Sequence, residues 1–239
     1  MRRLEGKVAL VTGASRGIGC AIARALLDEG AHTFLVSRRR EAVRKLAAAW
    51  NAAGGRAEAL SADVTREREV NRLIARVKKR SGRLDILINN AGVFTYKPFG
   101  KTTLEDWRSN IDTNLTGTFL CTRAALPLLK RKRGGHILNI ISVAGREAFE
   151  NCSAYCASKF GALGLSRVLA EELRPFGIRV TAVLPGPVRT KMIQKLGLRV
   201  PKGRILEPED VARTVVEALT QPQRASLEEI VLRPARGSL

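Results

Sequence analysis

Tyr155 and Lys159 have the residue types and the spacing for acid–base chemistry. They lie four residues apart in a segment, 151–161, that reads as the start of a helix, so both side chains project from one face. The helix rises about 6 Å between them, which brings the ammonium near the phenol oxygen. At an effective dielectric near 20, a cation about 5 Å away stabilises a phenolate by about 3 kcal/mol. The pair predicts a tyrosine pKa lowered from about 10 to about 8, suited to proton transfer near neutral pH.

The same spacing also occurs on solvated helix faces, so the interpretation depends on what the chain places beside this pair. Residues 7–12 form a short apolar run, typical of a strand buried on both faces of a parallel sheet. The run leads into Gly13-Ala-Ser-Arg-Gly17-Ile-Gly19, and helical periodicity follows to Gly30. In this context the glycines let backbone approach a pyrophosphate, whose charge the helix N-terminus stabilises. A dinucleotide site is predicted here.

The residues after a second apolar strand, 33–37, indicate which dinucleotide is bound. Where NAD-binding folds carry an acidic residue for the ribose hydroxyls, this chain has Ser37 followed by Arg38. No carboxylate repels a 2′-phosphate there, and Arg38 and Arg16 are suited to hold one. NADP(H) is therefore the predicted cofactor, with NAD(H) as the alternative. In the competing interpretation, Arg38 only begins an exposed basic helix that runs to about residue 53.

Strand and helix patterns alternate along the rest of the chain, without a composition break or an internal repeat. Further strands are expected at 56–60, 84–88, 136–141, 178–184 and 229–233. Helices are expected to end near residues 81, 132, 175 and 220, with a largely helical segment at 103–132. The pattern predicts one α/β domain over residues 1–239: a doubly wound, Rossmann-type sheet of seven parallel strands with helices on both faces.

Several predicted strands are followed by small or polar residues at the edge where open parallel sheets bind ligands. Asn89-Asn90-Ala91-Gly92 follows the fourth strand, Ser142 the fifth and Pro185-Gly186 the sixth. Asn114 interrupts an apolar helical pattern, so it is either satisfied by a local bond or placed for a purpose. The substrate pocket is expected to be built from the loops near 93–101, 144–152 and 190–206, the last as a loop or lid.

The chain is strongly basic, with 42 Lys and Arg against 22 Asp and Glu and a net charge of +20. Basic clusters at 38–40, 76–80 and 130–133 can attract phosphates, but each also fits a solvated helix face or a helix C-terminus. The clusters lack aromatic interleaving and a recognition-helix pattern, so specific nucleic-acid binding is not predicted.

Neither a membrane span nor a signal segment is predicted, and we expect a soluble, cytoplasmic protein. The four cysteines are not predicted to form a disulfide framework. Cys152 and Cys156 share a helical face, but no metal site is predicted because both histidines, His32 and His136, are distant from them in sequence. The cysteines are Cys20, Cys121, Cys152 and Cys156.

With these residues assembled, the chain resembles the short-chain dehydrogenase/reductase family along nearly its whole length. The ordered motifs are together far more specific than any one of them. They are Thr12-Gly13-x-x-x-Gly17-x-Gly19, Asp63-Val64, Asn89-Asn90-Ala91-Gly92, Asn114, Ser142, Tyr155-x-x-x-Lys159 and Pro185-Gly186. The resemblance implies an NAD(P)-dependent oxidoreductase that reduces a ketone or aldehyde to an alcohol, reversibly.

The resemblance also implies roles for individual residues. Tyr155 would protonate the carbonyl oxygen as hydride arrives, Lys159 would lower the tyrosine pKa and bond the nicotinamide ribose, and Ser142 would donate a hydrogen bond to the substrate oxygen. Asn114 would hold a water near Lys159. The implied cofactor-binding residues are Gly13, Ser15, Arg16, Gly17, Ile18, Gly19, Ser37, Arg38, Asp63, Val64, Asn90, Ala91, Gly92, Tyr155, Lys159, Pro185, Gly186, Val188 and Thr190.

The ending of the chain, 230–236, is more similar to the branch that acts on small hydroxy acids, aldehydes and ketones than to the reductases of fatty-acid synthesis. A 3-oxoacyl-[acyl-carrier-protein] reductase remains the alternative, since the basic segment 190–206 suits an acidic carrier. A non-catalytic cofactor-sensing or nucleic-acid-associated regulator is a third interpretation, which the intact proton relay disfavours.

The helix after Tyr155 is apolar around most of its surface, which predicts a homodimer or homotetramer.

Overall fold

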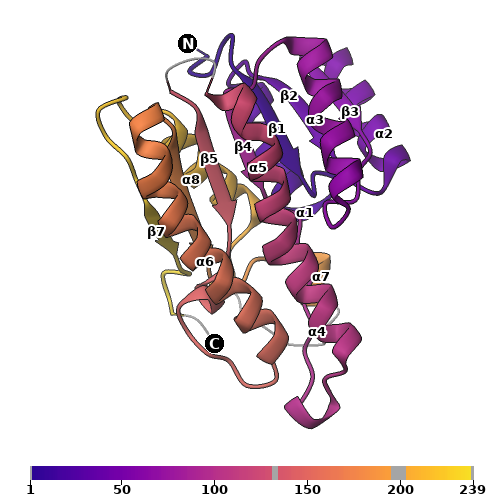
Figure 1. Ribbon diagram of the computed structural model, residues 1–239, viewed down its shortest axis with the longest axis vertical. Helices are drawn as coiled ribbons and strands as arrows, with labels where there is room; N and C mark the ends of the chain where they lie inside the picture. The colour runs from indigo at the N-terminus through magenta and orange to yellow at the C-terminus, as the bar shows by residue number, and fades with distance from the viewer. Residues whose placement is uncertain (1, 131–133, 195–202, 238–239) are drawn as a thin grey trace.

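Seven parallel strands form one twisted sheet in the computed structural model, which describes residues 2–130, 134–194 and 203–237 (Figure 1). The order is β3-β2-β1-β4-β5-β6-β7. After β3 the chain crosses back to the other side of β1, so the point at which the strand order switches lies between β1 and β4. The predicted fold is confirmed, and each predicted strand is found within two residues of its expected ends. The strands are β1 (Val8–Thr12), β2 (His32–Val36), β3 (Ala57–Leu60), β4 (Ile86–Asn89), β5 (His136–Ile140), β6 (Arg179–Pro185) and β7 (Glu229–Leu232).

Helices cover both faces of this sheet, which explains why strands such as β1, β4 and β5 are buried at every residue. Alternate residues of a strand point to opposite faces: Val11 of β1 joins one apolar core, whereas Leu10 joins the other. The first core is completed by α1 (Gly17–Asp28), α2 (Arg40–Ala52) and α8 (Pro208–Leu219), and the second by α3 (Glu67–Ser81), α5 (Gly117–Leu129) and α6 (Ser153–Leu173). The short α7 (Lys191–Gln194) follows β6.

The segment expected to be largely helical at 103–132 is helical but not continuous. It consists of α4 (Leu104–Asn110), the π-helical turn η2 (Ile111–Thr116) and α5. A π turn carries one extra residue, and such turns are frequent at functional sites. Asn114 lies in this turn and is buried. A Cβ on Gly117, the first residue of α5, would lie 2.8 Å from Val64, so glycine allows α5 to pass close to that side chain.

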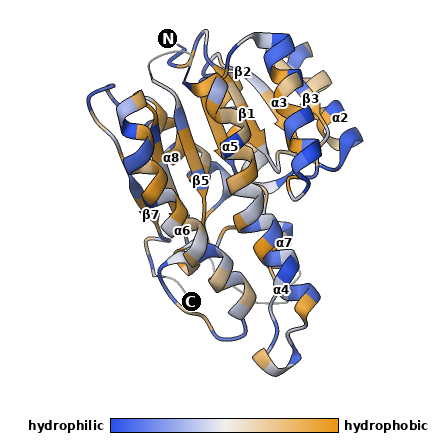
Figure 2. Cartoon of the chain, viewed as in Figure 1, coloured by the Kyte–Doolittle hydropathy of each residue, from blue (hydrophilic) through white to orange (hydrophobic). Residues whose placement is uncertain are grey.

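The basic cluster at 76–80 lies where helix chemistry accommodates it, whereas the cluster at 38–40 lies at the N-terminal start of α2. The last turn of α3 carries Lys78, Lys79 and Arg80, and the helix ends at Gly82 in the left-handed conformation, so these cations oppose the helix dipole. Figure 2 shows hydrophilic outer faces on α2 and α3 against hydrophobic strands. Part of the predicted cluster at 130–133 and part of the predicted loop 190–206 lie outside the described residues. Among the described helices, none combines the length and apolar character needed to cross a bilayer.

Candidate active site

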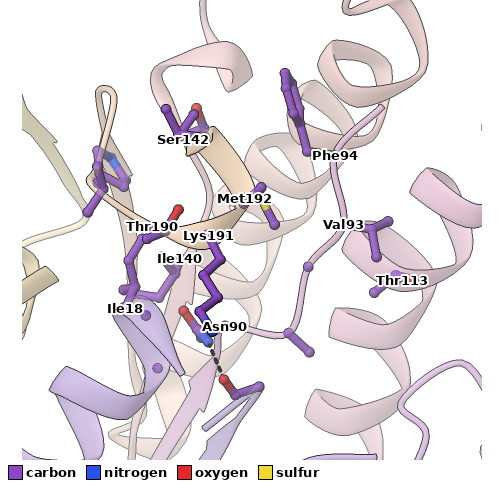
Figure 3. A pocket seen from close by; sticks show the side chains of 18 of the residues that line it. Ile18, Asn90, Val93, Phe94, Thr113, Ile140, Ser142, Thr190, Lys191 and Met192 are labelled. Carbon is purple, nitrogen blue, oxygen red and sulfur yellow. Dashed lines mark hydrogen bonds between the residues drawn. The ribbon is translucent and has the colours of Figure 1, made fainter. Parts of the chain in front are cut away.

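A cavity of about 810 Å³ lies along the carboxyl edge of the sheet, within the size range of small-molecule and cofactor sites. Its walls come from the glycine turn after β1, the segments after β2 and β4, the end of β5, the first turns of α6, and the segment from Pro185 to Gln194. The cavity brings together every residue of the predicted site except Asn114. Figure 3 shows Ile18 and Asn90 at one end and Ser142 and Phe94 at the other.

The glycine turn can accommodate a pyrophosphate. Helix α1 begins without a side-chain cap and without an acidic residue in its first turn, which leaves first-turn N–H groups for an anion. Gly13 and Gly17 have φ values of +66° and +57°, which side-chain-bearing residues rarely adopt. A Cβ on Gly19 would lie 2.3 Å from Asn90 Nδ2 and 2.6 Å from the Gly13 carbonyl oxygen. The turn is therefore packed too closely for any residue but glycine at this position.

Thr12 and Asn90 hold this turn in place. The Asn90 amide nitrogen donates to the carbonyl oxygens of Thr12 at 2.9 Å and Gly13 at 3.4 Å. Thr12 Oγ1 accepts from the backbone N–H groups of Asn90 and Ala91 at 2.9 and 3.0 Å. Asn90, one of the implied cofactor-binding residues, thus uses its amide nitrogen to join β4 to the glycine turn. Thr12 was part of the predicted motif but not of the predicted site, because a strand-end threonine carries no sequence signal of this role.

The adenosine end offers a set of donors that suits a 2′-phosphate. Arg38 is exposed, and its Nη1 lies 3.7 Å from Asp63 Oδ2, a loose surface pair of little intrinsic strength. Asp63 Oδ1 is held by the backbone N–H and the hydroxyl of Thr65 at 3.0 and 2.9 Å. Ser37 Oγ accepts from the N–H of Arg39 at 3.1 Å, which orders the start of this segment. Arg38 can therefore turn to a phosphate without leaving a buried carboxylate unpaired.

Tyr155 and Lys159 occupy successive turns at the start of α6. Lys159 is only 6% exposed; its Nζ donates to the Ile140 carbonyl oxygen at 3.2 Å and lies 5.6 Å from the centre of the Tyr155 ring. Burial lowers the pKa of Lys159 to about 8. Burial also raises the pKa of Tyr155 to about 12, against a smaller lowering by its hydrogen bond with Ser142.

The lowered tyrosine pKa expected from the helix spacing is therefore wrong for this structure. The spacing argument counted the attraction between an ammonium and a phenolate. It did not count the cost of removing the phenolate from water, which depends on the packing of distant segments and which dominates here.

Asn114 joins the loop after β4 to α6. Its Oδ1 accepts from the N–H of Val93 at 2.9 Å, and its Nδ2 donates to the Val93 carbonyl oxygen at 3.0 Å and to Ser158 Oγ at 2.9 Å. Ser158 Oγ in turn donates to the Tyr155 carbonyl oxygen at 2.7 Å. Both amide N–H donors of Asn114 are thus used within the protein, in contacts that position the Tyr155 helix against Gly92 and Val93.

Described residues of the three loops predicted for the substrate pocket line the other end of the cavity, but the individual side chains were not predicted. Phe94, Tyr96, Phe149, Cys152 and Met192 line this part of the cavity. An apolar residue in a loop gives no sequence signal that distinguishes a pocket wall from ordinary packing. Among the described residues, no group of three or more His, Cys, Asp or Glu side chains could hold a metal ion.

Comparisons with known proteins agree with this geometry. A family model described as short chain dehydrogenase matches residues 7–200. The chain is 37% identical to a sepiapterin reductase of Chlorobaculum tepidum, over 97% of this chain and 98% of the relative. It is 39% identical to a 3-oxoacyl-[acyl-carrier-protein] reductase of Synechocystis, over 94% of each.

Among solved structures, a metagenomic short-chain oxidoreductase in complex with NADP is 36% identical, with a TM-score of 0.85 over 98% of this chain and 99% of that one. The family model covers most of the chain, and these relatives match it nearly end to end. The protein belongs to the short-chain dehydrogenase/reductase family.

Proposed function

We propose that this protein is an NADPH-dependent carbonyl reductase that converts a ketone or aldehyde to an alcohol, reversibly. The proposal is supported above all by one observation: Ser142, Tyr155 and Lys159 converge at one end of a cavity whose other end contains the glycine turn and Arg38. The NADP in the metagenomic relative supports the choice of cofactor. A protein that only sensed its cofactor would have no need for a buried lysine beside a tyrosine.

Different residues of this chain would bind the cofactor and transfer the proton to the substrate. The glycine turn and the start of α1 would hold the pyrophosphate, and Ser37 and Arg38 the 2′-phosphate; NADPH, when bound, supplies the hydride. Ser142 donates a hydrogen bond to the substrate oxygen, where negative charge develops. Tyr155 remains protonated at neutral pH because its pKa is about 12, so it is available to protonate that oxygen. The ammonium of Lys159 then stabilises the phenolate that remains.

Carbonyl reduction is expected to slow as the pH rises through about 8. Below its pKa of about 8 Lys159 carries a positive charge, and above it the neutral amine no longer stabilises the phenolate. Tyr155, with its higher pKa, stays protonated across the same range. The measurement is kcat/KM for reduction from about pH 6 to about pH 10 at saturating NADPH. Lys159→Arg should move the decline to higher pH, and a wild-type profile that stays flat to the upper limit contradicts this role.

Arg38→Ala is expected to reduce the preference for NADPH over NADH by about tenfold or more, since hydrogen bonds between charged groups contribute about 1.5–3 kcal/mol. The measurement is the ratio of kcat/KM values for the two cofactors. Arg72→Ala removes the same charge from an exposed position on α3 and serves as the control. If both variants change the ratio equally, Arg38 acts only through net charge and not by contact with the phosphate.

We also propose that the protein forms a homodimer, or a homotetramer built from such dimers. Phe160 and Val168 lie two turns apart on α6 and are 46% and 53% exposed, and Phe119 on α5 is 42% exposed. Exposed large apolar side chains on adjacent helices mark an association surface, and a two-fold arrangement would cover the same side chains on both copies.

Reduction of a 3-oxoacyl group on an acyl carrier protein is the second candidate. It is supported by the name of the Synechocystis relative and by Lys191 and Arg204, described basic residues of the segment expected to meet an acidic carrier. A comparison of carrier-bound and free acyl substrates at low and high salt separates the two functions, because only carrier recognition depends on charges between proteins.

A further inference from the structure

The substrate end of the cavity is walled by aromatic rings, in a chain with only 5% aromatic residues. Phe94, Tyr96 and Phe149 all line it. Phe94 stands edge-on to Tyr155, with ring centres 4.5 Å apart and an angle of 86°, and its ring centre is 6.3 Å from that of Tyr96 at 29°. Phe94 therefore lies directly beside the tyrosine that would protonate the substrate, and Tyr96 lies beside Phe94. Figure 3 shows Phe94 at the same end of the cavity as Ser142, away from Ile18.

Part of this aromatic surface is open to an occupant. Tyr96 and Phe149 are 43% and 39% exposed, although both line the cavity. Exposed apolar surface beside a cavity is the kind that a bound ligand covers. Cys152 and Met192 add sulfur atoms to the lining, and sulfur makes favourable contacts with the edges of aromatic rings. These side chains form a surface to which a flat ring is better suited than a branched chain.

The charges that the structure describes at this end do not favour an acidic substrate. Among the described residues, two cations line the cavity apart from the arginines of the adenosine end and the buried catalytic lysine. Arg189 is paired with Glu207 at 2.7 Å, and the side chain of Lys191 extends toward Asn90, on the cofactor side (Figure 3). Glu150 also lines the cavity, and its exposed carboxylate would repel an acid. A neutral substrate fits this distribution better than the small hydroxy acids considered from the sequence.

The aromatic wall, formed by Phe94, Tyr96 and Phe149, is held in shape before any substrate binds. Asn151 has a φ of +62°, and its carbonyl oxygen accepts from the N–H of Lys97 at 2.8 Å. Its Nδ2 donates to the hydroxyl of Tyr96 at 3.4 Å. These contacts fasten the loop that carries Phe94 and Tyr96 to the loop that carries Phe149. A wall formed in advance loses little freedom on binding, so its shape can select among substrates.

We propose that the substrate is a neutral compound whose carbonyl group is attached to an aromatic ring. The proposal rests on the carbonyl-reductase function put forward above and names the substrate class for that site. The ring lies against Phe94 and Phe149, and the carbonyl oxygen meets Ser142 and Tyr155. Each aromatic pair in such an arrangement favours binding by about twofold to tenfold beyond the burial of apolar area.

Two ketones of similar size test the inference: acetophenone and cyclohexyl methyl ketone, each reduced with NADPH. The wild-type protein is expected to prefer acetophenone by about tenfold in kcat/KM, although conjugation makes its carbonyl the less electrophilic of the two. Phe94→Leu and Phe149→Leu keep apolar side chains but remove the rings, and each should lower this preference by about threefold, mainly through KM. The ratio cancels effects on Tyr155 that both ketones share.

Phe176→Leu is the matched control. Phe176 is exposed in the turn after α6, where Lys130 covers its ring at 3.5 Å, and it does not line the cavity. The Phe176→Leu substitution should leave the preference for acetophenone over cyclohexyl methyl ketone unchanged. Equal use of the two ketones, reduction of the alicyclic ketone alone, or a ratio that neither cavity variant alters would overturn the inference while leaving the carbonyl-reductase function intact. Absence of Tyr155-dependent NADPH oxidation with any carbonyl compound would instead overturn that function.

Discussion

Tyr155→Phe is expected to lower kcat for carbonyl reduction by at least about a hundredfold, the usual contribution of a positioned acid. The variant keeps the ring, which packs edge-on against Phe94 at 4.5 Å, and removes only the hydroxyl. With a pKa of about 12 the hydroxyl carries its proton at neutral pH, so the substitution removes a proton donor that is almost fully populated in the wild-type protein. Ser142 alone can polarise the substrate oxygen but leaves it without this proton source.

Fold and cofactor binding should survive this substitution, which separates loss of chemistry from loss of structure. The thermal midpoint and the affinity for NADPH are the two checks. Tyr96→Phe makes the same chemical change in a half-exposed tyrosine that lines the cavity. Loss of its bond with Asn151 can raise KM, but kcat should stay close to that of the wild-type protein because the Tyr96 hydroxyl does not deliver the proton. Near-normal turnover by Tyr155→Phe would mean that another group delivers the proton.

Gly19→Ala is expected to lower kcat/KM for NADPH by about a hundredfold, because displacement of a binding element by about 1 Å can cost that much. The added methyl group would lie 2.3 Å from Asn90 Nδ2 and 2.6 Å from the Gly13 carbonyl oxygen. The second of these is backbone and cannot rotate away, so the start of α1 must move from the turn. Overpacking of this kind also destabilises a fold by about 1–3 kcal/mol.

Urea unfolding and titration with NADPH measure the two effects separately. Gly100→Ala is the control, because a Cβ at that position meets nothing within 4 Å; it should alter neither quantity appreciably. If Gly19→Ala is destabilised but binds NADPH as tightly as the wild-type protein, the turn supports the fold and the pyrophosphate binds elsewhere.

The fold was predictable because its signals are local. Strands such as β1 and β6 are largely apolar and buried along nearly their whole length, as expected in a sheet covered on both faces. Helix periodicity identified α1, and the glycine turn between β1 and α1 is a short motif with a physical reason for each glycine. The position of Ser142 at the ligand-binding edge also followed from the sequence, since the carboxyl ends of parallel strands share one edge. The family resemblance implied that Tyr155 joins it in one site.

Only the tertiary structure decided how these residues are surrounded. The π turn at Asn114 depends on Val93 and Ser158, which come from other elements. The raised pKa of Tyr155 depends on how completely the folded chain removes it from water.

The aromatic wall depends on loops about fifty residues apart that meet through Asn151 and Lys97. Spacing along a chain reports the period of a helix or strand and the neighbours within a turn or two. Desolvation and cavity shape are sums over contacts between distant segments. The sequence by itself therefore identified the family and the candidate acid–base pair, and the packing decided the environment of Tyr155 and the shape of the cavity beside it.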